Sequence, residues 1–388
     1  MAISEKASFN PTVYLNNKLN GRSEDELNNP SRSVLEIPTV YYKDILNKAN
    51  LAKKRVWYAG MYFVVGHATG ILENTLIKAA QRGVDARLRI DSISDFMLHE
   101  GKIFFGRKPK PKDNSHPFEK ETTDQIFLNL EASDVLVTKT NPFGRIGELV
   151  PIFGRNHGKM TVIDDLVWVG GLNFSDVFFS EGVADYNVRM GRPGVVRAVA
   201  DHFKKTDENR IARDYSIECD SEYKFLADAG KRGESIIYDG AQKMVDEALP
   251  HEEIIFISQH FPDGPLLDKL ISRSKKGNPV TIIASHKNKK RIPKNPNSIE
   301  FEVKRRISNA ENLSVLYYPG HVHAKLLMVG QRKALFGSHN LVTIGIRLGT
   351  EEIAIQTTDL DLLGQLSQFV NVIKDASSYP LTSDHLQS

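Results

Sequence analysis

The stretch HVHAKLLMVGQRKALFGSHN, residues 321–340, places His323 and Lys325 at the start of an apolar strand that leads into Gly-Ser-x-Asn. Alternate residues of a strand share a face, so we expect these two side chains to project together. The pattern occurs again as HGKMTVIDDLVWVGGLN, residues 157–173. A lone histidine at a strand end is usually structural, whereas a duplicated His-x-Lys followed at nearly equal spacing by an asparagine favours a functional site.

The segments that surround the two copies repeat as well. Each half reads as helix, strand, helix and strand, and a glycine closes the second helix of each half. The predicted elements are helices over 40–55 and 71–83 with strands over 56–63 and 84–92, then helices over 235–253 and 265–277 with strands over 254–261 and 278–286. This is an internal duplication at the scale of a domain. The alternation predicts an α/β fold with a largely buried sheet in each half.

The duplication divides the chain into two predicted domains, residues 36–215 and 216–388. Residues 1–35 are polar and unpatterned, and we expect them to form a mobile tail, part of which can fold back onto the body. The first domain is longer because of an insertion at about residues 99–125, which is rich in Lys, Pro and aromatic residues. Such a long loop is often functional, so it is a candidate gate over a substrate as well as a solvated loop.

The composition is that of an ordinary globular protein, since 40% of the 388 residues are hydrophobic and 26% are charged. The net charge of +3 allows an anionic partner without requiring one. The single cysteine, Cys219, excludes a disulfide framework and a cysteine-based zinc site, and fits a reducing compartment. No signal-peptide pattern opens the sequence, and the longest apolar run, residues 56–65, is about half of what a membrane span needs. We therefore expect a cytoplasmic protein that binds at most to a membrane surface.

The residue types of the repeated pattern suit phosphoryl transfer. Two imidazoles can divide the roles of nucleophile and general acid. Two ammonium groups and two amides can bind the non-bridging oxygens of a phosphate, where negative charge gathers. This chemistry requires neither a metal nor another cofactor. His321 and His323 have a spacing compatible with zinc, but no third ligand stands out in the sequence.

His-x-Lys, an aspartate five residues after the lysine, and Gly-Gly-x-Asn or Gly-Ser-x-Asn together resemble the HKD motif of the phospholipase D superfamily. The resemblance extends over both halves, about residues 36–388. It implies two α/β domains packed about a pseudo-twofold axis with one shared active site. By position, it implies that His157 is the nucleophile that forms a phosphohistidine and that His323 is the general acid. The same comparison implies phosphate-binding or supporting roles for Lys159, Lys325, Asn173, Asn340 and Ser338.

Several acidic positions belong to the same comparison. Asp164 fills the aspartate position of the first motif. Asp185 in the first half, and Glu351 or Glu352 in the second, match the acidic residue that orients a catalytic histidine in the superfamily. The second motif departs from the pattern, because Gly330 stands where the aspartate is expected. We interpret this as the loss of a supporting carboxylate that a turn glycine can replace, and it leaves a weakened enzyme as an alternative.

Segment similarities within the superfamily favour a lipid substrate. The Asn-Pro-Phe turn and the GGLNFSD and DYNVRMGRPGVV segments are similar to those of bacterial cardiolipin-synthase-like members. The expected activity is metal-independent phosphatidyl transfer or phospholipase D hydrolysis. The alternatives are a nuclease of the same superfamily and a weakly active phosphodiester-binding scaffold.

The arrangement of the motifs also bears on partners. Both motifs lie in one chain, so we expect a monomer, whereas small nucleases of the superfamily often carry one motif per chain and dimerise. The basic loop over residues 285–297 follows a predicted strand. It is a candidate contact for a phospholipid headgroup or a nucleic-acid backbone, with a solvated loop as the alternative reading.

Overall fold

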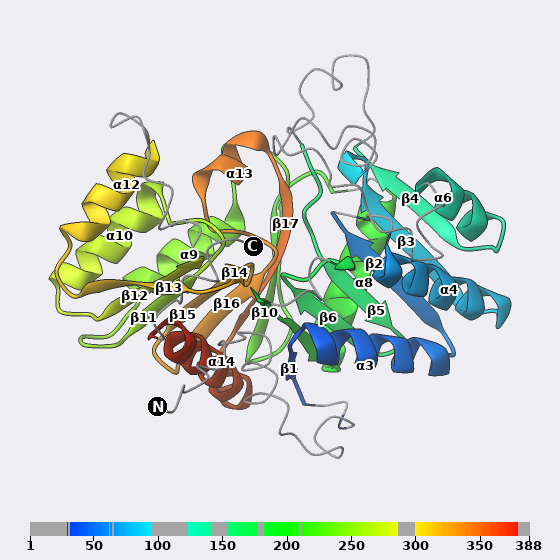
Figure 1. The fold of residues 1–388 in the computed structure, drawn as a ribbon, viewed down its shortest axis with the longest axis horizontal. Coiled ribbons are helices and arrows are strands. Elements are labelled where there is room, and N and C mark those ends of the chain that lie inside the picture. Colours follow the sequence, from blue (N-terminus) through cyan, green and yellow to red (C-terminus); the bar gives the residue numbers. More distant parts are fainter. Residues whose placement is uncertain are drawn as a thin grey trace, which may run out of the picture.

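The computed structural model describes residues 29, 32–61, 63, 66–94, 123–141, 154–176, 182–208, 211–285 and 299–378. Within these ranges the chain forms two large sheets that lie side by side, each flanked by helices (Figure 1). The first half of the chain builds one sheet and the second half builds the other. The predicted duplicated α/β architecture is therefore confirmed.

The first sheet has seven strands in the order β1-β8-β6-β5-β2-β3-β4. Its strands are β1 (Val34–Glu36), β2 (Arg55–Gly60), β3 (Asp85–Asp91), β4 (Leu136–Thr140), β5 (Met160–Ile163), β6 (Leu166–Gly170) and β8 (Asn187–Met190). The helices of this half are α3 (Pro38–Leu51), α4 (His67–Gln81), α6 (Thr123–Glu131) and α8 (Pro193–Asp207). Proline begins α3 and α8, at the position where its missing N–H removes no helical hydrogen bond.

The second sheet has eight strands in the order β13-β12-β11-β15-β16-β17-β10-β9. Its strands are β9 (Tyr215–Glu218), β10 (Tyr223–Ala229), β11 (Ile254–Ile257), β12 (Val280–Ser285), β13 (Leu313–Tyr318), β15 (Leu326–Val329), β16 (Lys333–Gly337) and β17 (Glu351–Thr357). The helices are α9 (Ile236–Asp246), α10 (Gly264–Lys275), α12 (Ile299–Ser308), α13 (Thr343–Leu348) and α14 (Leu360–Ser378). The second sheet, followed from β13 to β10, has the same strand order as the first sheet followed from β4 to β1. The two halves therefore share one topology.

One hydrophobic core joins the two halves. It contains Trp57 and Phe203 from the first half together with Phe369 of α14 from the second. A small parallel pair, β7 (Val183–Ala184) and β14 (His321–Val322), crosses the same boundary. Because burial of apolar surface is the main favourable term in folding, this shared core holds the two sheets against each other.

The end of the predicted tail is folded. β1 begins at Val34 and pairs with β8, so the last residues of the predicted 1–35 tail belong to the first sheet. Ser33 also accepts a hydrogen bond from the hydroxyl of Tyr223 at 2.7 Å. The sequence did not reveal this strand because three residues are too few to show a period. Residues 1–28, most of the 99–125 insertion and most of the basic loop lie outside the described residues.

Asp164 lies in the turn between β5 and β6, at the end of β5 that is remote from the first His-x-Lys pair. Its carboxylate accepts hydrogen bonds from the backbone N–H groups of Lys53, Lys54 and Arg55 at 2.8 to 3.3 Å. The backbone of Asp164 has a φ of 48°, a turn conformation that Asp tolerates. This carboxylate therefore ties the turn to the start of β2.

Gly330 occupies the corresponding turn between β15 and β16. A Cβ at this position would lie 2.3 Å from Oε1 of Glu252. That carboxylate accepts the N–H of Leu249 at 2.8 Å and pairs with Arg332 at 2.8 Å. Lys325 and Gly330 are five positions apart along the extended strand, or about 16 Å at a rise of about 3.3 Å per residue. The missing aspartate therefore changes a distant turn and leaves the end that bears the histidine unaltered.

We predict that Asp164→Ala lowers the free energy of unfolding by about 1–2 kcal/mol, because three backbone donors lose their acceptor. Urea denaturation measures the change. Asp165→Ala is the matched control, since Asp165 makes only an exposed ion pair with Lys54. An unchanged unfolding midpoint, or a loss of more than tenfold in turnover by the folded variant, would contradict this assignment.

Candidate active site

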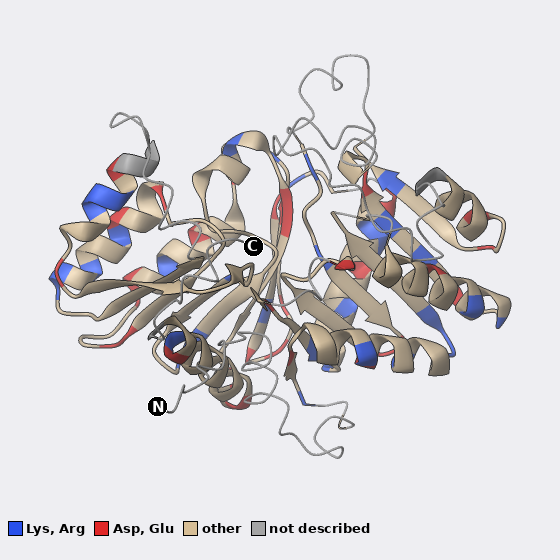
Figure 2. Ribbon diagram, in the orientation of Figure 1, with Lys and Arg blue, Asp and Glu red and all other residues tan. Residues whose placement is uncertain are grey.

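His157 lies just before β5 and is held by a carboxylate from the other half of the chain. Its Nδ1 is 2.8 Å from Oε1 and 3.0 Å from Oε2 of Glu352, which belongs to β17. The acidic start of β17, red in Figure 2, lies between the two halves. Both side chains are buried, so solvent does little to weaken the contact.

His323 shows the reciprocal arrangement. Its Nδ1 is 2.6 Å from Oδ2 of Asp185, which lies just before β8 in the first half. The acid of each half therefore holds the histidine of the other half. A carboxylate at Nδ1 fixes the orientation of an imidazole ring and favours the proton on that nitrogen, which leaves Nε2 available for chemistry.

Backbone hydrogen bonds repeat this crosswise arrangement. The N–H of His157 donates to the carbonyl of Glu351 at 2.8 Å, and the N–H of Glu351 donates to the carbonyl of Arg155 at 2.8 Å. In the second motif, the N–H of His323 donates to the carbonyl of Ala184 at 2.9 Å. The two motifs are thus brought together at the boundary of the halves, as the resemblance implied.

Of the two candidate glutamates, Glu352 places its carboxylate on the His157 ring, whereas the carboxylate of Glu351 bonds to Asn156. Successive residues of a strand point to opposite faces, so the two side chains diverge. Oε2 of Glu351 accepts a hydrogen bond from Nδ2 of Asn156 at 2.6 Å. Burial raises the pKa of Glu351 to about 7. This residue therefore supports the segment that precedes His157 rather than its ring.

Lys159 and Lys325 contribute two buried ammonium groups. Nζ of Lys159 donates to the carbonyl of His157 at 2.9 Å, and Nζ of Lys325 lies 3.1 Å from both ring nitrogens of His323. Burial lowers the pKa of Lys159 to about 7, and repulsion from Lys325 adds to the effect. Burial likewise lowers the pKa of Lys325 to about 8. An anion bound beside them would favour the charged form of both.

The histidines and their acids differ in protonation. Burial lowers the pKa of His157 to about 4, although Glu352 opposes the shift. Burial alone would raise the pKa of Glu352, but the contact with His157 outweighs it and the pKa falls to about 2. Burial lowers the pKa of His323 well below its ordinary value and raises that of Asp185 to about 7. At neutral pH, His157 is thus a neutral imidazole beside an ionised carboxylate, while the His323–Asp185 pair exchanges a proton near neutrality.

Asn173 and Asn340 each keep a buried amide atom without a hydrogen-bond partner among the described residues. In Asn173 this atom is Nδ2, while Oδ1 accepts the N–H of Met61 at 3.3 Å. In Asn340 it is Oδ1. A buried polar atom without a partner is costly, so both amides fit a site that a polar ligand completes.

Ser338 supports a carboxylate. Its Oγ donates to Oε2 of Glu352 at 2.5 Å and accepts the N–H of Ile353 at 3.0 Å. In the first motif Gly171 takes the corresponding place, where a Cβ would lie 2.3 Å from Oδ1 of Asp185. The hydroxyl is therefore already engaged with the acid that holds the first histidine.

The residues that hold the segment before each motif were missed from the sequence. Asp91, at the end of β3, accepts hydrogen bonds from Nη1 of Arg155 at 3.0 Å and from the N–H of Asn156 at 2.6 Å. In the second half, Ser285 at the end of β12 accepts the N–H of Val322 at 2.8 Å. Their position at the carboxyl ends of parallel strands, where α/β sites form, is the signal that could have identified them.

Metal and membrane features can be assessed for the part of the chain that the structure describes. There, no group of three or more His, Cys, Asp or Glu side chains is placed to hold a metal ion. The rings of His321 and His323 are 5.9 Å apart, centroid to centroid. In the same ranges, no helix has the length and apolar character that crossing a bilayer demands.

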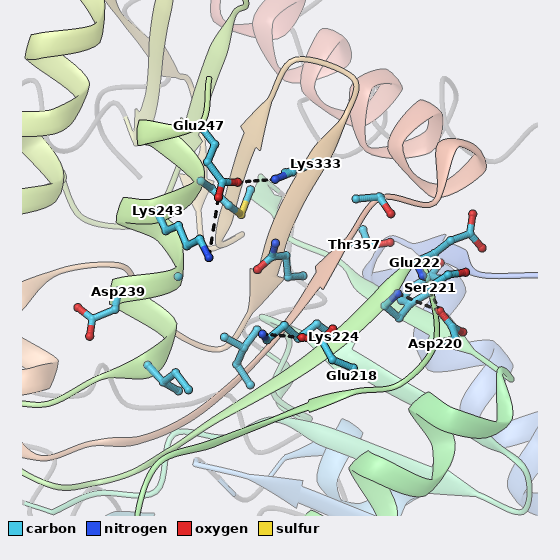
Figure 3. Close-up of a pocket in the computed structure, with 17 residues that line it drawn as sticks. Glu218, Asp220, Ser221, Glu222, Lys224, Asp239, Lys243, Glu247, Lys333 and Thr357 are labelled. Carbon is cyan, nitrogen blue, oxygen red and sulfur yellow. Dashed lines mark hydrogen bonds and ion pairs between the residues drawn. The ribbon is translucent and has the colours of Figure 1, made fainter. Parts of the chain in front are cut away.

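A cavity of about 410 Å³ lies in the second half (Figure 3). Residues of β9, β10 and α9 contribute to its lining, which includes no histidine or lysine of the two His-x-Lys pairs. Each of its three lysines faces an acid: Lys224 pairs with Glu218 at 2.7 Å, and Lys243 and Lys333 both pair with Glu247. Because these cations are already neutralised, the cavity lacks the positive charge that phosphate binding in the motif site would use.

We predict that sulfate binds at least tenfold more weakly at pH 9 than at pH 6. Below pH 7 both motif lysines are charged, and rising pH removes their protons and ionises Asp185, which also repels an anion. Sulfate keeps a constant charge over this range, so calorimetric titration reports on the protein groups. Lys325→Ala should remove most of the binding, whereas Lys333→Ala should leave it unchanged. Affinity that is independent of pH would contradict the lowered lysine pKa values.

Comparisons with known proteins agree with this geometry. Residues 45–206 and 244–373 match the family model described as "Cardiolipin synthase, PLD-like domain". The structure of phosphatidylserine synthase from Haemophilus influenzae Rd KW20 superposes with a TM-score of 0.63 at 14% identity, covering 95% of this chain and 91% of that chain. Polyphosphate kinase from Porphyromonas gingivalis superposes with a TM-score of 0.56 at 12% identity, covering 94% of this chain and 55% of that chain. At these identities the likeness concerns the fold alone.

No curated protein matches the sequence. The family model nevertheless covers well over half of the chain, and its two segments each contain one of the repeated motifs. The chain therefore belongs to the phospholipase D-like family described as "Cardiolipin synthase, PLD-like domain".

Proposed function

We propose that the protein is a metal-independent phosphodiesterase that transfers a phosphatidyl group from a phospholipid through a phosphohistidine. The observation that supports this most directly is the crosswise pairing of the two histidines. At the boundary between the halves, the His157 imidazole is neutral and bonded to Glu352. The His323–Asp185 pair lies at the same boundary and titrates near neutrality. A nucleophile and a general acid need this difference in protonation.

In the proposed first step, Nε2 of His157 attacks the phosphorus of the phosphodiester. An N–P bond forms and the P–O bond to the leaving alcohol breaks. The protonated His323–Asp185 pair gives the Nε2 proton of His323 to the departing oxygen, which leaves a neutral His323 with its Nδ1–H bonded to Asp185. The Nδ1–H of His157 donates to Glu352 throughout, which stabilises the charge that develops on the ring. Lys159 and Lys325 stabilise the charge on the non-bridging oxygens.

In the proposed second step, an acceptor hydroxyl gives its proton to Nε2 of His323 and attacks the phosphorus. The N–P bond breaks, a new P–O bond forms and His157 is regenerated. Water as the acceptor gives hydrolysis, and a lipid or other alcohol gives phosphatidyl transfer. No step of this sequence uses a metal ion.

Two findings support a lipid rather than another phosphodiester. The matching family model is named for cardiolipin synthase, and the Haemophilus influenzae structure that superposes on both halves is that of a phosphatidylserine synthase. Both motifs of the site come from one chain, which supports action as a monomer. Such a protein would meet its substrate at a membrane surface.

The remote position of Gly330 argues against the binding-scaffold alternative. Its turn lies at the end of β15 opposite to His323 and Lys325, and Glu252 fills the space that an aspartate would need. The groups proposed to do the chemistry are all in place in both motifs. The nuclease alternative is decided by the choice of substrate in the experiment below.

We predict that the purified protein, with EDTA present, converts phosphatidylglycerol vesicles and ethanol into phosphatidylethanol, read by mass spectrometry. His157→Asn should lower the rate at least a thousandfold, because no other group can form the covalent intermediate. His251→Asn is the matched control, since His251 is exposed and has a φ of 61°, a conformation that Asn accepts.

A parallel incubation contains single-stranded DNA in place of the vesicles. Cleaved DNA with unchanged lipid would overturn the lipid assignment and identify a nuclease. Turnover that EDTA abolishes, or that His157→Asn leaves intact, would overturn the proposed chemistry itself.

A further inference from the structure

Glu352 belongs to a buried cluster that includes a second carboxylate. In the register of β10 and β17, Asp228 lies directly opposite Glu352. Directly opposed residues of antiparallel strands have Cβ atoms about 5 Å apart. Both side chains are buried. Two buried carboxylates at this spacing repel each other strongly when both are ionised, so a proton is expected to remain on one of them.

His339 is the third member of the cluster. It is buried, and its Nδ1 accepts the N–H of Leu341 at 2.7 Å, so a neutral ring carries its proton on Nε2. Nε2 lies 3.8 Å from Oδ2 of Asp228. Burial lowers the pKa of His339, which keeps the ring neutral. A neutral donor thus lies near the carboxylate of Asp228 and within electrostatic reach of Glu352.

The surroundings of Asp228 favour its protonated form. Ser235 Oγ donates to it at 2.6 Å and the N–H of Ile237 at 3.2 Å, but burial outweighs these contacts, and the charge of Asp214 adds to the effect. The pKa of Asp228 consequently rises to about 8. The proton of the cluster therefore lies on this carboxylate.

The surroundings of Glu352 favour its ionised form. Burial alone would raise its pKa, but the contact with His157 outweighs burial, the charge of Lys159 adds to the lowering, and the Ser338 hydroxyl donates to the same carboxylate. The proton of the cluster therefore lies on Asp228, and the negative charge lies on Glu352.

The first half provides an internal comparison, because the equivalent acid there has no such neighbours. Leu172 stands where the second motif has His339. β1 pairs with β8 as β10 pairs with β17, but at the place that corresponds to Asp228 the chain has already entered α3 at Pro38. Neither of these two positions offers Asp185 a carboxylate or an imidazole, and burial raises the pKa of Asp185. The cluster accompanies only the acid that holds His157.

We propose that Asp228 and His339 form a positioning pair that keeps the negative charge on Glu352 and so keeps the Nε2 lone pair of His157 free for attack. The inference rests on the proposed role of His157 as nucleophile. Neither residue of the pair contacts the phosphate. The pair acts through Glu352. Asp228 keeps the proton of the cluster on its own carboxyl group, and His339 adds an N–H donor near that group and within electrostatic reach of Glu352.

The test measures kcat and KM from pH 4 to pH 9 with bis(p-nitrophenyl) phosphate. His339→Leu installs the residue of the first motif, and we expect the acidic limb of kcat to move up by at least half a pH unit, with KM within twofold. Asp228→Asn reproduces the neutral form of the Asp228 side chain. We therefore expect kcat at pH 6 to stay within threefold of wild type and the acidic limb of the kcat profile to stay at its wild-type pH. His202→Leu is the control, because His202 is buried against Tyr215 outside the site.

If the two residues had a purely structural role, their substitution would lower kcat by the same factor at every pH, and the acidic limb of the kcat profile would stay at its wild-type pH. That result for His339→Leu, or an upward shift for Asp228→Asn, would overturn the inference. Nitrogen-15 NMR of labelled histidine, with His157→Asn for assignment, gives a readout independent of turnover. If the wild type hydrolyses no phosphodiester, the proposed function fails, whereas an Nδ1–H signal of His157 that is unchanged in His339→Leu refutes the positioning pair alone.

Discussion

Two carboxylate–imidazole hydrogen bonds that cross between the halves are the contacts on which the site depends. His157 is oriented by Glu352 and His323 by Asp185, so neither half holds a complete catalytic unit. The shared hydrophobic core and the β7–β14 pair maintain the boundary at which these contacts form. Burial at that boundary gives the hydrogen bonds their strength and also shifts the pKa values of the groups involved.

The duplicated halves have diverged around this common frame. The acid that holds His157 is a glutamate supported by Ser338, whereas the acid that holds His323 is a shorter aspartate against Gly171. The two histidines are equivalent in topology, but they differ in the protonation of their partners. A reaction that needs one nucleophile and one general acid requires such a difference, and the unequal surroundings of the two acids provide it.

The sequence was sufficient for the fold class, the duplication and the identity of both His-x-Lys pairs, because these depend on local patterns that occur twice. It was not sufficient for contacts that depend on how the halves pack. The choice between Glu351 and Glu352 follows from the face of β17, and the structural role of Asp164 follows from the position of the β2 backbone. The strand at Val34 was hidden within a polar segment, since three residues show no period.

Asp228 and His339 illustrate the same limit. Asp228 lies 124 residues before the glutamate that it opposes, and only the register of β10 with β17 brings the two together. The histidine could have been noticed as the difference between Gly-Gly-Leu-Asn and Gly-Ser-His-Asn. Its relation to a buried carboxylate could not have been read from the sequence, because it depends on side chains from three separate strands and loops.

The crosswise pairing is tested most directly by the rate at which phosphate is trapped on His157. In a His323→Asn variant the general acid is absent, and the covalent adduct formed from a phosphodiester with an activated leaving group can be followed by mass spectrometry. Adding Glu352→Gln should slow adduct formation at least tenfold, whereas adding Asp185→Asn should change it less than twofold, because the partner of Asp185 is already gone. The reverse order, or equal effects of the two substitutions, would contradict the account that each acid serves the histidine of the other half.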